Sequence, residues 1–591
     1  MNYSLSKDQE DKKVPLKAAF LKMAPMLSDE KAKLVVSFIM VLLNSGLALV
    51  GPLMVGYTID TAIANGDYGA VLVNSAILLG IYLAAYATSY IQMKTMGGVA
   101  QRMLFKLRNE VFGKLQSLPL AFFNQNKAGD LISRINSDTE KLNMFFSQGL
   151  MRFVGNIVLT VGAGVFILFI NWKLALAALI PGVVIIIFTQ AMSRWVKSAN
   201  AKSLSATGLL SAEIQESIAN FKVILAFNRR DYFKARFGEA NQKNYKGALG
   251  AGMANELFSP VYELCGNIAL LIVLGYGISL IAQGQFAVGL LVSFVLYVTR
   301  FYDPLREMAR LWSMFQVAMA AWDRIGVILH MESNLIVIEE SAAHKKSTHP
   351  DAVMEFKNVS FGYDNGKKVL NDINFTFEKG KTYALVGPTG GGKTTTASLV
   401  SRLFDPTEGT VFLHGKDIRS YSLPDRAQKI GFILQEPFMF TGTVRENLLY
   451  GNPHFTKDAA GNGADLEARL KETGLDSLLS RFSKGLDTPI GATTSLSLGE
   501  KQLIAFIRAV LRKPDILILD EATANIDTVT EELLQTVLDK LPKETTRIVI
   551  AHRLNTIENA DDIFFVNGGE VVEAGSMEHA VDMLLHGKRK S

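Results

Sequence analysis

The chain has 591 residues, 49% of them apolar, with a mean hydropathy of +0.20 and a formal net charge of +5. This length allows two or more domains, and the hydropathy argues against a wholly soluble protein. A single cysteine, Cys265, excludes an internal disulfide, and a lysine-rich N-terminus before a long apolar run does not fit a cleavable signal peptide.

Six apolar stretches in the first half of the chain are each long enough to cross about 30 Å of hydrocarbon. Runs such as VLTVGAGVFILFI and LALAALIPGVVIIIF lack the polar face of a helix in a soluble core, which argues against six buried helices of a soluble protein. We expect membrane spans at residues 34–58, 71–92, 151–171, 174–194, 261–282 and 286–307.

The distribution of positive charge predicts the orientation of these spans. Lysine and arginine are concentrated in two long connections, residues 93–150 and 195–258, whereas the three short loops contain one lysine between them, Lys173. By the positive-inside bias, both long connections and both termini lie in the cytoplasm. We therefore expect a multi-pass protein of the cytoplasmic membrane, with the lipid bilayer as its surroundings.

The two long connections show helical spacing of apolar residues, which predicts arms that continue from the spans into the cytoplasm. The first arm turns within residues 118–138, where Pro119 and Gly129 are the expected turn-formers around an exposed Phe122 and Phe123. The second is expected to turn near residues 226–237. Exposed aromatic side chains need a partner surface, and a folded-back loop is the alternative.

After a polar linker, strands and helices alternate, and residues 381–403 predict a strand, a glycine-rich turn and a helix. The turn fits the phosphate-binding pattern G-x-x-x-x-G-K-[ST]. Its glycines let successive backbone N–H groups face the phosphates of ATP, its lysine reaches them, and the threonine directly after the lysine, Thr394, binds Mg²⁺. We expect these roles for Gly387, Pro388, Thr389, Gly390, Gly391, Gly392, Lys393, Thr394 and Thr395.

The sequence DILILDEATANID, residues 515–527, supplies the matching acidic residues. Its apolar run predicts a buried strand ending at Asp520, which is placed to hold Mg²⁺ directly or through water. Glu521 follows in position to orient or deprotonate the water that attacks the terminal phosphate. An acidic turn after a core strand is the alternative interpretation.

These motifs and the six spans resemble the ABC transporter superfamily, in particular bacterial exporters of drugs and lipids. The resemblance implies an all-α six-helix transmembrane domain followed by an α/β P-loop nucleotide-binding domain. It implies a cytoplasmic segment at residues 1–33, a transmembrane domain at 34–335, a linker at 336–352 and an ATP-binding cassette at 353–591.

The resemblance also assigns single residues. Tyr363 is similar to the aromatic that stacks on adenine, and Gln435 to the glutamine that senses Mg²⁺ and the attacking water. His552 is similar to the histidine that bonds the terminal phosphate, and Asp527 belongs to a loop that communicates across a dimer. The tips of the two arms resemble coupling helices that seat on the nucleotide-binding domain.

One motif departs from the family pattern. Where the family has Leu-Ser-Gly-Gly-Gln, which contacts the ATP bound by a second subunit, this chain has Leu-Ser-Leu-Gly-Glu at residues 496–500. Ser497 and Gly499 remain available to a phosphate. Leu498 would cost about 1–2 kcal/mol if a left-handed backbone were needed there. Glu500 places a negative charge near a triphosphate, which is worth roughly 3 kcal/mol at ~6 Å and an effective dielectric constant of ~20.

We therefore expect an ATPase that exports an amphipathic drug, lipid or peptide by alternating access, with ATP and Mg²⁺ as cofactors. Its partner is a second half-transporter, with a heterodimer favoured over a homodimer. An importer of metal chelates and an ATP-gated channel or regulator are the alternatives. No nucleic acid is expected, because DNA-handling ATPases lack such spans. Candidate substrate contacts are Asn44, Glu263, Asn267, Tyr297 and Arg300.

Overall fold

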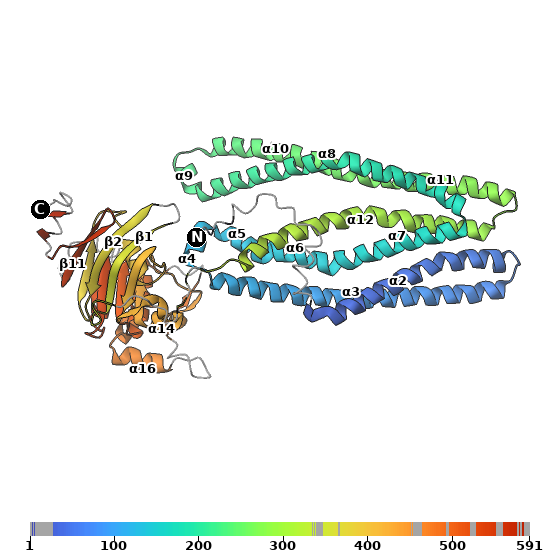
Figure 1. Cartoon of the computed structure of the whole chain (residues 1–591). Coiled ribbons are helices and arrows are strands. Elements are labelled where there is room, and N and C mark those ends of the chain that lie inside the picture. Colours follow the sequence, from blue (N-terminus) through green and yellow to red (C-terminus); the bar gives the residue numbers. More distant parts are fainter. Residues whose placement is uncertain are drawn as a thin grey trace. The chain divides into compact units, whose positions relative to one another are not determined.

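The computed structural model describes residues 3, 5, 28–333, 335, 337–338, 347–363, 367–450, 452, 464–491, 496–520, 528–550, 560–575, 578–579 and 582–583. The chain divides into two compact units (Figure 1). The helical unit comprises Gln9–Gln116 and Ala128–Met331. The sheet unit comprises Met1–Asp8, Ser117–Lys127 and Glu332–Ser591, and it contains every strand of the described residues.

The helical unit contains six helical stretches that are long and apolar enough to cross a membrane. Each predicted span lies inside one of these stretches or extends at most two residues beyond its end. The predicted number and order of spans are therefore confirmed. The stretches are Ser28–Ile63, Tyr68–Gln116, Ala128–Ile170, Trp172–Ala219, Arg230–Ala282 and Val288–Leu329.

The principal helices of this unit lie side by side as a bundle (Figure 1). They are α2 (Lys31–Tyr57), α3 (Tyr68–Gln116), α7 (Leu150–Ile170), α8 (Trp172–Ala219), α10 (Arg230–Glu256), α11 (Phe258–Ala282) and α12 (Val288–Leu329). Shorter helical segments connect them: η2 (Ser28–Glu30), η3 (Thr58–Ile63), α5 (Ala128–Ser133), η4 (Arg134–Asp138), α6 (Thr139–Met144), η5 (Phe145–Gly149) and α9 (Phe221–Ala226).

Small residues let α2 and α12 approach closely, as is common where helices pack in membranes. A Cβ atom on Gly56 would lie 2.4 Å from the carbonyl oxygen of Gly289, so neither position has room for a side chain. Asp60 accepts hydrogen bonds from the backbone N–H groups of Gly289 (2.6 Å) and Leu290 (3.0 Å). These bonds satisfy the free donors at the start of α12, where hydrocarbon would offer no partner.

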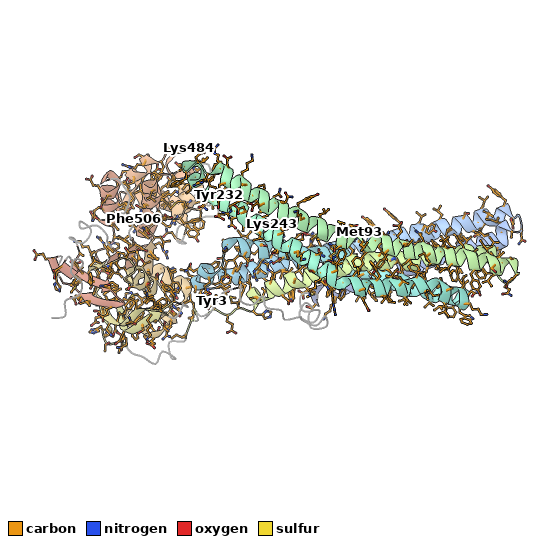
Figure 2. The ribbon with its side chains drawn as sticks, turned by 90° about the horizontal axis from the view of Figure 1, so that it is seen from above. Tyr3, Met93, Tyr232, Lys243, Lys484 and Phe506 are labelled. Atoms are coloured by element: carbon orange, nitrogen blue, oxygen red, sulfur yellow. The ribbon has the colours of Figure 1, made fainter. Side chains whose placement is uncertain are left out.

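The arms have the length that the sequence predicts. At 1.5 Å per residue, the 49 residues of α3 and the 48 of α8 each extend about 70 Å, more than twice the hydrocarbon thickness. Helix α10 packs along α8 through Arg236, which donates to Glu213 (2.7 Å), and through an amide pair between Asn200 and Asn255 (3.0 and 3.1 Å). Tyr232 and Lys243 mark the course of α10 in Figure 2.

The tips of the arms differ in detail from the prediction. Pro119 does precede a new helix, α4 (Leu120–Gln125), but Gly129 lies inside α5 and forms no turn. The second connection runs from Asn220 to Arg229 around α9, so most of the predicted turn at residues 226–237 is helix α10. Asn228 makes this turn with φ +49°, a backbone conformation that asparagine tolerates better than most residues.

The sheet unit is built on a six-stranded sheet in the order β12-β11-β3-β10-β9-β6, in which only β12 is antiparallel to its neighbour. A four-stranded antiparallel sheet has the order β2-β1-β4-β5, and β7 pairs with β8. The strands are β1 (Met354–Gly362), β2 (Lys368–Phe377), β3 (Thr382–Val386), β4 (Glu408–Leu413), β5 (Lys416–Asp417), β6 (Ile430–Ile433), β7 (Gly442–Thr443), β8 (Pro489–Ile490), β9 (Ile516–Asp520), β10 (Thr546–Ile550), β11 (Asp562–Asn567) and β12 (Glu570–Glu573).

Helices flank the parallel sheet, and the strands between them are buried, as in α/β proteins with both sheet faces covered. The predicted all-α membrane domain followed by an α/β domain is therefore confirmed. The helices are α13 (Lys393–Val400), η7 (Ile418–Ser420), α14 (Leu423–Lys429), α15 (Val444–Leu449), α16 (Ala464–Glu472), η9 (Asp476–Arg481), η10 (Gly485–Asp487), α17 (Leu498–Leu511) and α18 (Thr528–Leu538).

Candidate nucleotide site

The glycine-rich loop connects the buried end of β3 to the start of α13. Gly387 has φ +146°, and a Cβ atom there would lie 2.0 Å from the carbonyl oxygen of Val566 in β11. A Cβ atom on Gly391 would lie 2.5 Å from the same oxygen. The loop is thus pressed against β11 at both ends, whereas its tip at residues 388–390 is exposed.

Lys393 begins α13 and is buried, with 5% of its surface exposed. Its ammonium group donates to the carbonyl oxygens of Gly387 (2.9 Å) and Pro388 (3.1 Å), so it folds back over the loop. Thr394 is exposed beside it. A phosphate in the loop would meet backbone N–H groups, an ammonium and a hydroxyl, which is the donor set that suits a triphosphate.

Tyr363 lies next to this loop. Its hydroxyl is 3.1 Å from the hydroxyl of Thr395, and its ring packs edge-on against Phe361 and Phe404. The side chain remains 39% exposed. A partly exposed aromatic ring held beside a phosphate-binding loop is a suitable surface for a planar base.

The carboxyl ends of the parallel strands bring further predicted residues to the same edge of the sheet. Leu385 of β3 and Asp520 of β9 are both in register with Ile550 of the strand between them, β10. Neighbouring strands are about 4.8 Å apart, so β3 and β9, which lie on either side of β10, are about 10 Å apart. Asp520 is buried, and Gln435 follows β6 on the other side of β9 and is exposed.

Three predicted residues, Glu521, Asp527 and His552, lie outside the described residues. Glu521 directly follows β9, and His552 comes two residues after β10, so both follow strands that end at this edge. In parallel sheets ligands bind beyond the carboxyl ends of the strands. The cradle at Gly387 and Gly391 and the buried Lys393 and Asp520 fit ATP with Mg²⁺.

The altered motif forms the start of helix α17. The backbone N–H of Glu500 donates to the hydroxyl of Ser497 (3.2 Å), and the backbone N–H of Ser497 donates to the Glu500 carboxylate (2.7 Å). This is a capping box, which satisfies free N–H groups of a helix N-terminus. The Ser497 hydroxyl also donates to Glu500 (2.9 Å), so its proton already has a negatively charged acceptor.

The backbone strain considered for Leu498 does not arise. Leu498 is the first residue of α17, and its φ is not in the left-handed region. At Gly499 the structure leaves little room for a side chain. A Cβ atom there would lie 3.0 and 3.1 Å from the Cγ2 and Oγ1 atoms of Thr530 in α18. The sequence indicates nothing of this contact, since Thr530 lies thirty-one residues further along the chain.

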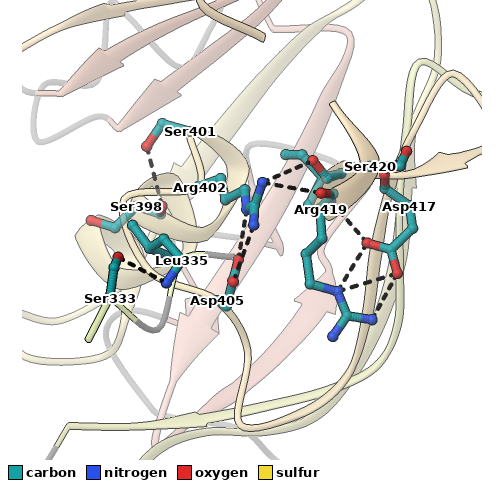
Figure 3. Close-up of polar contacts among 10 residues, drawn as sticks. Ser333, Leu335, Ser398, Ser401, Arg402, Asp405, Asp417, Arg419 and Ser420 are labelled. Carbon is teal, nitrogen blue, oxygen red and sulfur yellow. Dashed lines mark hydrogen bonds and ion pairs between the residues drawn. The ribbon is translucent and has the colours of Figure 1, made fainter. Parts of the chain in front are cut away.

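A buried arginine that sequence reasoning missed fixes the far end of α13 (Figure 3). Arg402 is 2% exposed and donates to both carboxylate oxygens of Asp405 (2.8 and 3.4 Å) and to the carbonyls of Ile418 and Arg419. Burial, and secondarily the charge of Arg402, lowers the pKa of Arg426 to about 10. The hydrogen bonds of Arg402 therefore anchor the end of α13, the helix that carries Lys393.

The tip of the first arm, Ser117–Lys127, belongs to the sheet unit. Phe122, predicted to be exposed, is fully buried, whereas Phe123 is 41% exposed. Asn126 donates to the carbonyls of Tyr3 (2.9 Å) and Phe122 (2.7 Å), so the tip also holds residues from the start of the chain. The predicted exposure of Phe122 is therefore wrong, whereas Phe123 is exposed as predicted.

Among the predicted substrate contacts, two have structural partners. Tyr297 is fully buried, and its hydroxyl donates to the carbonyl of Leu49 (2.5 Å). Asn44 donates to the carbonyl of Ala85 (3.4 Å). Tyr297 is thus a packing residue, because its polar atom faces α2 and not a cavity.

Comparison with known protein families gives a match for each of the two units. Residues 34–305 match the family model of the ABC transporter transmembrane region, and residues 370–524 match that of the ABC transporter. The chain is 32% identical to the uncharacterized ABC transporter ATP-binding protein YfiC of Bacillus subtilis (strain 168), over 94% of this chain and 91% of the relative.

Two further relatives have names that state a substrate. The chain is 32% identical to the fatty acid ABC transporter ATP-binding/permease protein of Mycobacterium tuberculosis (strain CDC 1551 / Oshkosh), over 86% of this chain and 79% of the relative. It is also 32% identical to the ATP-dependent lipid A-core flippase of Syntrophus aciditrophicus (strain SB), over 85% of this chain and 82% of the relative.

Proposed function

This chain belongs to the ABC transporter superfamily as a half-transporter of the exporter type, and from that premise we propose that it hydrolyses ATP to export an amphipathic molecule across the cytoplasmic membrane. The observation that carries the proposal is that one chain contains both six candidate membrane spans and a glycine-rich loop suited to the phosphates of ATP. Relatives that are named for fatty acid and lipid A-core support a lipid-like substrate over a peptide.

We assign the chemistry to residues at the carboxyl edge of the six-stranded sheet. Lys393 and the loop N–H groups hold the phosphates, and Tyr363 stacks on the base. Thr394 and Asp520 would hold Mg²⁺, which would neutralise charge on the phosphates. Glu521 takes the proton of the attacking water, and Gln435 and His552 position the water and the terminal phosphate.

ATP closes two nucleotide-binding domains, and the arms carry this closure to the spans. The step requires that ATP bind more tightly to the closed state than to the open one, since only a difference in affinity shifts an equilibrium. Ser497, Gly499 and Asp527 face the second subunit in this proposal. The burial of Phe122 within the sheet unit supports the first arm as a coupling element.

The test uses the full-length complex in proteoliposomes with a fluorescent lipid and a panel of amphipathic drugs and peptides. Glu521→Gln should bind ATP, remain in a closed dimer and lose at least about 100-fold in turnover. Lys393→Ala should fail to bind ATP. ATP-driven accumulation on the side opposite the nucleotide-binding domain is expected. Flux without hydrolysis, uptake in the other direction, or normal turnover by Glu521→Gln would contradict the proposal.

We also propose that the partner is a different chain. Glu500 places a carboxylate on the Ser497 hydroxyl, which supports a weakened contact with the partner's ATP. The competent site would then combine Glu521 of this chain with a standard Leu-Ser-Gly-Gly-Gln motif of the partner. Native mass spectrometry of the complex from its own host decides this, because a mass of twice this chain would establish a homodimer instead.

A further inference from the structure

A polar pocket of about 280 Å³ lies between α11 and α12 within the helical unit. Its lining residues recur at intervals of three and four along each helix, so each helix contributes one face. From α11 come Tyr262, Glu263, Gly266, Asn267 and Leu270, and from α12 come Val298, Thr299, Tyr302, Asp303 and Arg306.

The pocket has three charged side chains without partners. Within the described part of the chain, Glu263, Asp303 and Arg306 make no ion pair or hydrogen bond, and all three are exposed in the single chain. A charged side chain in contact with hydrocarbon costs about 2.5–3.5 kcal/mol on insertion scales, so such residues face protein or a water-filled cavity. Two carboxylates against one guanidinium leave the pocket with an excess negative charge.

The charges lie at one end of the pocket and the apolar residues at the other. Glu263 is 19 residues from the end of α11 at Ala282, a distance of about 28 Å along the helix. Leu270 is 12 residues from that end, about 18 Å. The charged end is therefore close to the membrane boundary on the side of the arms, and the apolar end is near mid-membrane.

Two tyrosines give the pocket a fixed wall. The Tyr262 hydroxyl is 2.9 Å from the hydroxyl of Thr189, and the Tyr302 hydroxyl donates to the carbonyl of Ala178 (2.7 Å). Both bonds go to α8, so the hydroxyl groups are already used and the rings are held in place. Aromatic rings beside carboxylates favour a cation over an anion.

We propose that this pocket receives the head of the transported molecule, and that the head carries a positive charge on an apolar body. This inference rests on the proposed export function and names its substrate class. A cationic amphiphile entering from the leaflet on the side of the arms would place its charge between Glu263 and Asp303. Its apolar part would lie along Leu270 and Val298.

The test measures binding to the full-length complex in lipid nanodiscs without nucleotide, with empty nanodiscs as the lipid control. The probes are tetraphenylphosphonium and tetraphenylborate, which have the same shape and opposite charge. The wild type should bind the cation more tightly than the anion. The double variant Glu263→Gln, Asp303→Asn should lose about tenfold in affinity for the cation, which corresponds to about 1.4 kcal/mol.

Glu307→Gln is the matched control, because Glu307 is on the same helix but pairs with Arg310 and does not line the pocket. It should bind the cation as the wild type does. Equal binding of both ions by the wild type, or an unchanged affinity in the double variant, would overturn the inference. The ATPase rate of the same preparation separates the two failures, since wild-type turnover without cation binding leaves the export proposal intact.

Discussion

The first turn of α17 shows how one carboxylate serves a helix and works against a ligand. Glu500 completes the capping box with Ser497, which stabilises the helix, and it also accepts a hydrogen bond from the Ser497 hydroxyl. In the proposed function that hydroxyl would donate to a phosphate of the partner's ATP. A carboxylate is favourable at a helix N-terminus for the dipole and unfavourable beside a triphosphate. The two effects can be separated, because a glutamine at this position keeps the box and removes the charge.

Glu500→Gln should lower the KM for ATP several-fold, because it removes a negative charge facing the partner's triphosphate and releases the Ser497 hydroxyl. The cost in stability should be no more than about 1 kcal/mol, the usual value of a charge at a helix N-terminus. Steady-state ATPase assays and thermal unfolding measure both effects. Glu446→Gln is the control, since Glu446 forms the same capping box with Thr443 at the start of α15. An equal fall in KM in both variants would refute the electrostatic explanation.

Gly499→Ala should destabilise the sheet unit by about 1–2 kcal/mol, because its Cβ atom would crowd Thr530. The second substitution Thr530→Ala removes both atoms that would be crowded, so the double variant should recover most of the loss. The four proteins form a double-mutant cycle, read by thermal unfolding. Additive losses would show that Gly499 is small for a reason other than α18.

At the scale of elements, the sequence predicts what depends on hydropathy and local pattern. The six spans, the glycine-rich loop and the strand ending at Asp520 are continuous in sequence, so they can be recognised without tertiary information. The sequence predicts a turn at Gly129 and an exposed Phe122, and both predictions are wrong, since Gly129 lies inside α5 and Phe122 is buried. The hydrogen bond from Asn126 to the carbonyl of Tyr3 joins residues more than 120 positions apart, a contact at this tip that no local sequence pattern indicates.

The short helices at the start of the third span depend on a charged cluster. Asp138 of η4 is fully buried and lies 2.8 Å from the ammonium of Lys141 and 3.3 Å from the guanidinium of Arg324 in α12. Asp130 of α5 accepts from the same Arg324 (2.6 Å) and from Arg134 (3.0 Å). The cluster therefore attaches α5 and η4 to the sixth span.

Asp138→Asn should destabilise the helical unit by about 2 kcal/mol, less than a fully buried pair because Lys141 and Arg324 are partly exposed. Thermal unfolding in detergent, followed by intrinsic fluorescence, gives the change. Asp231→Asn, at an exposed position in the first turn of α10, is the control and should change stability by less than about 0.5 kcal/mol. A loss no greater than that of the control would show that the cluster does not hold α12.

At the scale of the whole molecule, the proposed function assigns one set of residues to the chain's own ATP and another to the ATP of a second subunit. The loop at Gly387–Thr395 and the edge at Asp520 belong to the first set, and Ser497 and Gly499 to the second. A sequence pattern indicates each set but not the partner's residues, because these lie on another subunit. Identity with ABC transporters over most of the chain establishes the family.

The most direct test compares ATP turnover by single-chain and two-chain particles. Purified chain, with its native partner where one co-purifies, is placed in nanodiscs, and particles with one or two transporter chains are separated by mass. Turnover per chain should be confined to the two-chain particles and restored when single chains are allowed to associate. Equal turnover per chain in particles that contain one chain would contradict the proposal that the site is completed by a second subunit.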